Sequence, residues 1–155
     1  MKPPLRTIGL VAAGLVVGLL VGGYLGVTVG SKPIRELTVL ASIAWASSTA
    51  DVQYQNAGYA EAREALESYI AVLQRAAEHP ELNFTHGVRS DIGLAYTRLA
   101  LLAEANGKAS EAPALMAKAV EAARAGGFRE PTPEHLRAYV LRLSPPPTPT
   151  PKPGA

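Results

Sequence analysis

The sequence predicts an all-α protein in which an apolar segment precedes a small domain of about five helices. Residues 7–29 carry no charge, and about 20 such residues are enough to cross a bilayer as a helix. From residue 34 onward, apolar residues recur every three or four positions, which is the spacing of amphipathic helices. No stretch shows the strict alternation of a half-buried strand.

Residues 7–30 are the predicted transmembrane helix, and residues 1–6 form a short basic amino terminus. At about 1.5 Å per residue the segment spans the hydrocarbon core. A cleaved signal peptide is the alternative, but its apolar region usually has about 7–15 residues. The length therefore favours an uncleaved, single-pass anchor in the lipid bilayer.

The charges that flank the apolar segment predict its orientation. Lys2 and Arg6 precede it, whereas Lys32 and Arg35 follow it. With the terminal amine, the positive-inside tendency gives a slight bias toward an inside amino terminus. We expect a bacterial-type inner membrane, with the domain in the periplasm or outside the cell.

A ladder of glycines runs through the apolar segment at intervals of four residues. Its members are Gly14, Gly18, Gly22, Gly26 and Gly30. Small residues at this spacing allow two transmembrane helices to approach closely. We expect the ladder to pack on another membrane protein or on a second copy of this chain. Glycine without a partner helix is the alternative, since membrane helices are generally richer in glycine.

The charge distribution argues against nucleic acid as a partner. Apart from Lys2, Arg6 and Lys32, which lie beside the apolar segment, 12 of the 15 Lys and Arg residues remain against 13 acidic residues, so these charges nearly balance. No basic stripe that could follow a phosphate backbone is present in the sequence. The absence of cysteine excludes disulfides, thiolate nucleophiles and cysteine-bound metals.

The first helix of the domain is predicted from Pro33, which suits a first turn, to about residue 56, before Gly58. Its apolar face is expected to contain residues spaced by three and four. These are Ile34, Leu37, Leu40, Ala41, Ala44 and Ser48, with Ile43 and Trp45 broadening the face. We expect Trp45 and Tyr54 to be core or interfacial residues.

Four further helices are predicted from caps and stop signals. Their ranges are 59–79, 85–105, 110–125 and 132–143. Pro80 ends the first of these and Gly107 the second. Ser110 is expected to cap the third, and Thr132 the fourth. Residues 31–143 thus form the helical domain, and the proline-rich residues 144–155 are expected to be a disordered, extended tail.

Two stretches resemble tetratricopeptide repeats, which are stacked helix–turn–helix units. The clearer one carries the spacing of large, small and turn residues typical of the repeat. It reads Tyr96-xx-Leu99-Ala100-xx-Ala103-xxx-Gly107-xxxx-Ala112-xxx-Met116-xx-Ala119. Residues 58–66 are similar to the start of the repeat's second helix, so the resemblance covers about residues 46–125.

The resemblance implies a TPR-like domain that binds a protein or peptide partner. On the family pattern the binding face comes from the first helix of a pair, here at Leu94, Thr97, Leu101 and Glu104. Packing against a neighbouring helix is the other interpretation of these positions. The sequence thus favours a membrane-anchored, non-catalytic adaptor or scaffold. The alternative is a small accessory or assembly subunit of a membrane complex, docked through its glycine-rich helix.

No catalytic, cofactor-binding or metal-binding residues are predicted. His79, His86 and His135 lack the spacing that places two ligands on one helical face. A metal site assembled from His79, His86 and Asp91 is an alternative, although nothing in the sequence fixes their geometry. No serine lies in a nucleophile-elbow motif, so we expect a protein that is not an enzyme.

Overall fold

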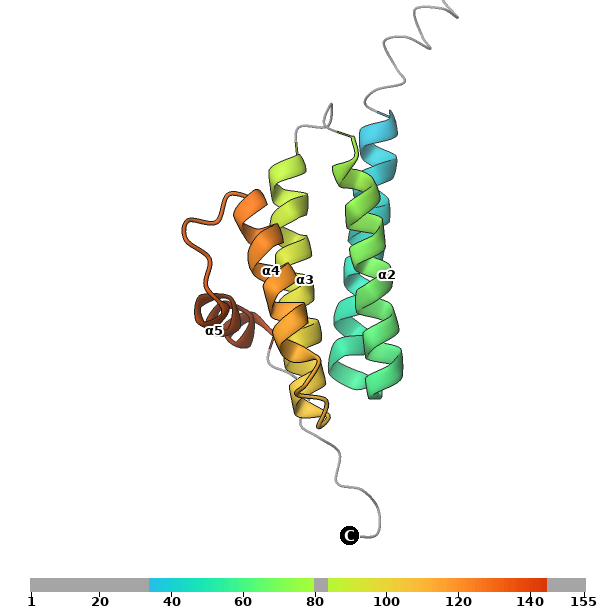
Figure 1. Cartoon of the computed structure of the whole chain (residues 1–155). Coiled ribbons are helices and arrows are strands. Elements are labelled where there is room, and N and C mark those ends of the chain that lie inside the picture. Colours follow the sequence, from blue (N-terminus) through green and yellow to red (C-terminus); the bar gives the residue numbers. More distant parts are fainter. Residues whose placement is uncertain (1–33, 80–83, 145–155) are drawn as a thin grey trace, which may run out of the picture. The chain divides into compact units, whose positions relative to one another are not determined.

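The computed structural model describes residues 34–79 and 84–144, and the regular secondary structure in these ranges is entirely α-helical. Five helices are present in them, which confirms the predicted all-α class (Figure 1). They are the helix over residues 34–56, α2 (Tyr59–Ala77), α3 (Thr85–Ala105), α4 (Ala112–Ala125) and α5 (Pro133–Leu143). The α3 bounds agree with the predicted range at both ends.

The chain divides into two compact units, residues 1–40 and 41–155. In the first unit the described residues are helical and expose Ile34, Leu37 and Leu40. The five ladder glycines and the predicted transmembrane helix lie outside the described residues, as do residues 145–155 of the tail. Within the described ranges, no helix combines the length and the apolar character needed to span a bilayer.

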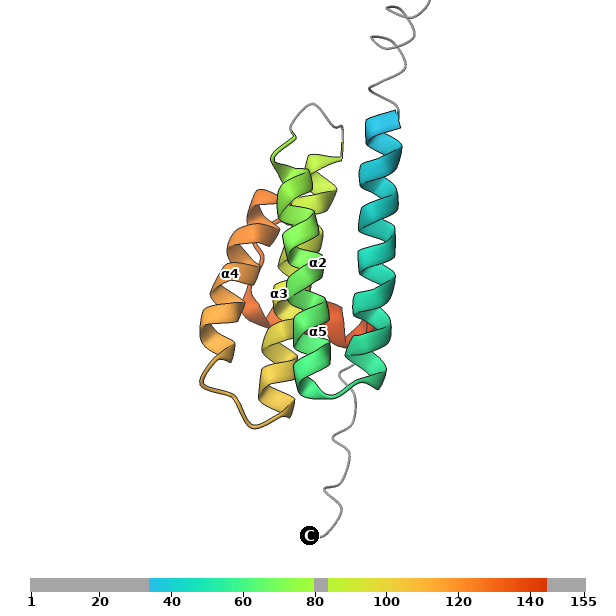
Figure 2. The same cartoon turned by 90° about the vertical axis from the view of Figure 1, so that its right-hand side faces the viewer.

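In the second unit, α3 is the central helix. It contacts α2, α4 and α5, and α2, α3 and α4 run antiparallel in sequence order (Figures 1 and 2). Its buried residues are spread around the helix rather than along one stripe, as expected for a helix with neighbours on several sides. Residues 41–56 stand beside α2 (Figure 2).

Glycines end α3 and α4 in the way that the sequence predicts. Gly107 follows α3 with a φ of +74°, and Gly127 follows α4 with a φ of +91°. Glycine adopts this left-handed conformation without steric cost. The chain then turns back, so that the Lys108 amide donates to the Ala103 carbonyl at 2.8 Å. These bonds satisfy carbonyls that the helix end leaves without an intrahelical donor.

The two predicted caps have different outcomes. Thr132 caps α5, because its Oγ1 accepts a hydrogen bond from the His135 amide at 3.2 Å. The prediction that Ser110 caps α4 is wrong, since α4 begins at Ala112 with Glu111 in the cap position and no side-chain cap. The Glu111 amide already donates to the Lys108 carbonyl at 3.0 Å in the preceding turn.

Small residues bring α3 and α4 together, as expected from the helical-pair pattern. Ala100, Ala112 and Ala119 are at most 2 % exposed and pack in one cluster with Met116. At Gly93, an added Cβ would lie 2.9 Å from the Cβ of Ala123 on α4. Gly93 therefore permits a close approach between the two helices.

The predicted apolar face of the helix over residues 34–56 is wrong in orientation. Its buried residues are Ala46, Ala50 and Tyr54, whereas the large side chains of Trp45 and Val52 are exposed. Alanine allows the neighbouring helix to come close, so the buried face is made by small residues and one tyrosine. The larger apolar residues are left on the outer side of the helix.

The candidate interaction groove

The face predicted to bind a partner is largely occupied by contacts inside the chain. Thr97 is fully buried, and its hydroxyl donates to the Gly93 carbonyl at 2.9 Å. Leu101 is 7 % exposed, and Leu94 packs against the α3–α4 cluster. Glu104 is half-buried and hydrogen-bonded to α5. Thr97, Leu101 and Leu94 therefore belong to the packed interior, and Glu104 lies at its edge.

Glu104 is held by Arg137 of α5. Each of its carboxylate oxygens accepts a hydrogen bond from the guanidinium, and both distances are 2.5 Å. This hydrogen bonding is the main cause that lowers the pKa of Glu104, and burial opposes it. Since bidentate Arg–carboxylate pairs fix geometry as well as charge, the pair holds α5 against the end of α3.

An open groove lies between residues 41–56 and α2. It encloses about 380 Å³. The lining comes from two helices that are adjacent in sequence and antiparallel in space. It consists of Trp45, Ala46, Thr49 and Gln53 from the first helix, and Glu61, Glu64, Ala65, Ser68, Tyr69 and Val72 from α2. We call this the Trp45 groove.

Trp45 forms the most exposed apolar part of the groove. Its side chain is 74 % exposed, the highest value among the large exposed hydrophobic residues of the described chain. Val52, two turns further along the same helix, is 55 % exposed. Indole surface of this size is costly to leave in water and is typical of interface residues.

The groove carries negative charge at the α2 side. Glu61 and Glu64 line it, and among the described side chains neither forms an ion pair. The nearby Arg63 is engaged elsewhere: its Nε lies 2.8 Å from Glu67 Oε1 and its Nη1 lies 2.6 Å from Glu111 Oε2. Hydrogen bonds to Glu67 and then to Glu111 raise the pKa of Arg63.

Polar side chains from three helices lie near the floor of the groove. Tyr69 lines the groove and is 5 % exposed, while Ser47 and, on α3, Asp91 are close enough to influence the pKa of its hydroxyl. Burial raises the pKa of the Tyr69 hydroxyl, and it also raises the pKa of the Asp91 carboxyl. Ser47, Tyr69 and Asp91 come from three different helices, so residues 41–56, α2 and α3 meet near the groove.

Arg98 joins the same helices at a second point. Its Nη1 lies 2.6 Å from Asp51 Oδ1, and its guanidinium carbon lies 5.9 Å from the centre of the Tyr54 ring. Tyr54 is fully buried, and its hydroxyl has no hydrogen-bond partner among the described residues. Burial raises the pKa of Tyr54 to about 12. The Asp51–Arg98 pair and the buried ring of Tyr54 join residues 41–56 to α3.

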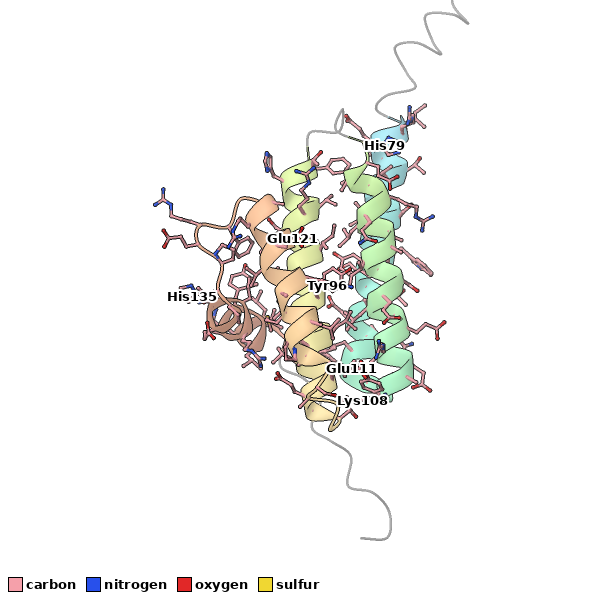
Figure 3. The ribbon with its side chains drawn as sticks, viewed as in Figure 1. His79, Tyr96, Lys108, Glu111, Glu121 and His135 are labelled. Atoms are coloured by element: carbon pink, nitrogen blue, oxygen red, sulfur yellow. The ribbon has the colours of Figure 1, made fainter. Side chains whose placement is uncertain are left out.

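A second cavity of similar size, about 380 Å³, lies among α2, α3 and α4. Its lining carries both signs of charge, from Glu78, Arg89, Lys118 and Glu121. The Lys118 ammonium lies 5.6 Å from the centre of the Tyr96 ring, and Figure 3 shows Tyr96 beside α4. This balanced lining gives the cavity no marked preference for a charged ligand.

The histidines singled out in the sequence do not gather. His79 lies at the end of α2 and His135 on α5, well separated in Figure 3. In the described part of the chain, no group of three or more His, Asp or Glu residues is arranged to hold a metal ion. The alternative site formed by His79, His86 and Asp91 therefore gains no support from the described residues.

Comparison with known proteins adds no relative: no protein-family model, no curated protein and no solved structure matches this chain. The resemblance to tetratricopeptide repeats therefore stays a prediction based on the residues quoted above.

The sequence did not point to the Trp45 groove. Trp45 was expected in a core or interface, and Glu61 and Glu64 belong to a helix that is rich in charged residues. The one available signal was a large aromatic residue in a stretch, positions 41 to 50, that is otherwise Ala, Ser and Thr with the single isoleucine Ile43. Because the surrounding residues are mostly small, they cannot cover an aromatic side chain of this size.

Proposed function

We propose that this chain is a membrane-anchored, non-catalytic adaptor whose helical domain binds a protein partner at the Trp45 groove. The observation that carries the proposal is the 74 % exposed indole of Trp45 at the edge of an open groove. Exposed aromatic residues beside a cavity are frequent anchors of protein–protein interfaces, where tryptophan contributes much of the binding energy.

The polar lining supports a peptide-like ligand. Thr49, Gln53 and Ser68 supply hydroxyl and amide groups beside the apolar surface of Trp45 and Val72. A protein segment offers both backbone hydrogen-bonding groups and side chains, so it can satisfy such a mixed surface. The two carboxylates, Glu61 and Glu64, favour a segment that carries a positive charge.

The predicted anchor adds to this function. A domain tethered to a bilayer is confined near other membrane proteins, which raises its effective concentration. The glycine spacing of residues 14–30 supports a second candidate, an accessory subunit whose anchor packs on the helix of another membrane protein. The two candidates differ in which region holds the partner.

Affinity purification of the tagged full chain from mild detergent distinguishes them. Under the adaptor proposal, Trp45→Ala removes the co-purifying partner, whereas Leu141→Ala, at an exposed leucine of α5, retains it. Under the subunit candidate the partner survives Trp45→Ala and is lost with Gly18→Leu and Gly22→Leu together. Retention of the same partner by all three variants would contradict both.

A further inference from the structure

We propose that the proline-rich end of the chain, residues 145–155, binds in the Trp45 groove of its own domain. This intramolecular contact requires no partner protein, so it stands or fails separately from the adaptor function. It gives the groove a first occupant that any partner must displace.

The place where the tail begins supports the contact. Ser144 is 4 % exposed, and its Oγ accepts a hydrogen bond from Gln55 Nε2 at 3.4 Å. Gln55 lies on the helix that carries Trp45, two residues beyond Gln53 of the groove lining. The tail therefore leaves the domain beside the helix that forms one wall of the groove.

The tail is long enough to reach the groove. Passing halfway around a helix about 10 Å in diameter requires a path of about 16 Å. Residues 145–152, in the extended conformation that prolines favour, cover about 25 Å at roughly 3.1 Å per residue. The tail can therefore pass over the helix and bring Lys152 to the α2 side.

The proline-rich tail and the Trp45 groove are chemically complementary. Proline-rich segments bind grooves lined by aromatic side chains, and the groove offers the exposed indole of Trp45. Lys152 is the only Lys or Arg in the tail, and it would face Glu61 and Glu64. Because the tail is tethered, its effective concentration is high and a weak contact is sufficient.

A second copy of the chain is a poorer occupant. Two facing grooves would bring four carboxylates together, from Glu61 and Glu64 of each copy, and the lining contains no Lys or Arg. Like charges facing each other across an interface are unfavourable. The tail brings a positive charge instead.

Trp45 is the only tryptophan of the chain, so its fluorescence tests the proposal directly. The full chain is compared in mild detergent with a chain that ends at Ser144, using acrylamide as the quencher. We expect the shortened chain to show stronger quenching and emission at longer wavelength. A synthetic peptide of residues 145–155 should reverse both changes, and the same peptide with Lys152→Ala should reverse them less.

Variants of the full chain supply the controls. Lys152→Ala, and Glu61→Gln with Glu64→Gln, should each increase quenching, whereas Lys118→Ala, on α4, should not. Far-ultraviolet circular dichroism establishes that each chain keeps its helices. Equal quenching of the full and shortened chains would overturn the proposal. Quenching that decreases equally in both with rising protein concentration would also overturn it, by assigning the groove to a second copy.

Discussion

Arg137 of α5 binds both carboxylate oxygens of Glu104 at the end of α3, at 2.5 Å each. The pair joins two helices whose residues are 33 positions apart in sequence. It also explains why the predicted partner-binding face is partly closed. A charged residue that could have recognised a ligand is used to hold the fifth helix in place.

Glu104→Gln should weaken the packing of α5 by about 1 kcal/mol at neutral pH, because it removes a charge-assisted bidentate pair that is about two-thirds buried. The pKa of Glu104 is lowered in the folded state, so its contribution is present above the unfolded pKa of about 4.3. That contribution is lost as the pH falls through the lower folded value. Thermal unfolding at several pH values checks this.

Measurements at low pH provide the control for the Glu104–Arg137 pair. The difference between wild type and Glu104→Gln should vanish as the pH falls through the folded pKa, since both side chains are then neutral. In a double-mutant cycle, Arg137→Gln should add little to Glu104→Gln. Fully additive losses would show that the two residues act independently.

Gly93→Ala should destabilise the domain by about 1–3 kcal/mol through overpacking. The added Cβ would lie 2.9 Å from both the Cβ and the backbone nitrogen of Ala123, and neither atom can move without shifting α4. Gly87→Ala is the matched control on the same helix, because nothing lies within 4 Å of its added Cβ. It should be neutral or stabilising by up to about 1 kcal/mol. Equal effects of the two substitutions on the melting temperature would contradict the packing.

Tyr54→Phe should leave the free energy of unfolding unchanged at neutral pH or raise it by about 1 kcal/mol. The hydroxyl is buried without a partner among the described residues, and an unsatisfied polar group is costly. Tyr59→Phe is the control, since the Tyr59 hydroxyl accepts a hydrogen bond from Arg63 at 2.9 Å. A marked loss of stability in Tyr54→Phe would reveal a hydrogen bond that this packing does not contain.

Alkaline pH gives Tyr54 a second test. Its pKa is raised to about 12, above the unfolded value of about 10. The stability that depends on the neutral form of the Tyr54 hydroxyl is therefore fully present below about pH 10. It is lost as the pH rises through the folded pKa, because the buried hydroxyl resists ionisation. Denaturant unfolding should show a smaller alkaline loss for Tyr54→Phe than for wild type. Identical pH profiles would contradict the burial of the hydroxyl.

Asp91→Asn should keep or increase the melting temperature at pH 7. Burial is the main cause that raises the pKa of Asp91, and the charge of Arg98 and the hydrogen bond with Tyr69 oppose it. A raised folded pKa means that the stability due to this group is full below the unfolded pKa of about 3.9 and falls at higher pH. The advantage of asparagine should therefore shrink as the pH approaches 4. A lower melting temperature at pH 7 would show that the charge stabilises the fold.

The sequence was a good guide to helix positions because glycine, proline and cap residues act locally. Thr85–Ala105 was predicted at both ends, and Gly107 and Thr132 have the expected roles. Ser110 was not a cap because backbone bonds of the preceding turn took that role. Hydrogen bonds between neighbouring residues can thus be predicted from the sequence, except where a side-chain cap and a backbone turn are alternatives at the same position.

The orientation of the first helix and the position of the groove were not predictable in this way. Large apolar residues suggested a buried face, but Ala46 and Ala50 are buried and Trp45 is exposed. Which face is buried depends on how closely α2 and α3 approach, which is a property of three helices together. The groove likewise requires Trp45 and Glu64 from different helices, and no local pattern joins them.

A photoreactive phenylalanine derivative at position 45 of the full chain, which keeps a large aromatic side chain in the groove, tests the proposed interaction surface most directly when it is irradiated in the cells that make the protein. The same residue at position 141 of α5 serves as the control, because Leu141 is also exposed. A discrete heavier species, formed at position 45 and not at position 141, is the predicted result. A crosslink to the chain's own tail would leave the mass unchanged and is separable by gel. The absence of a heavier species at position 45, or the same species at both positions, would contradict a partner-binding role for the Trp45 groove.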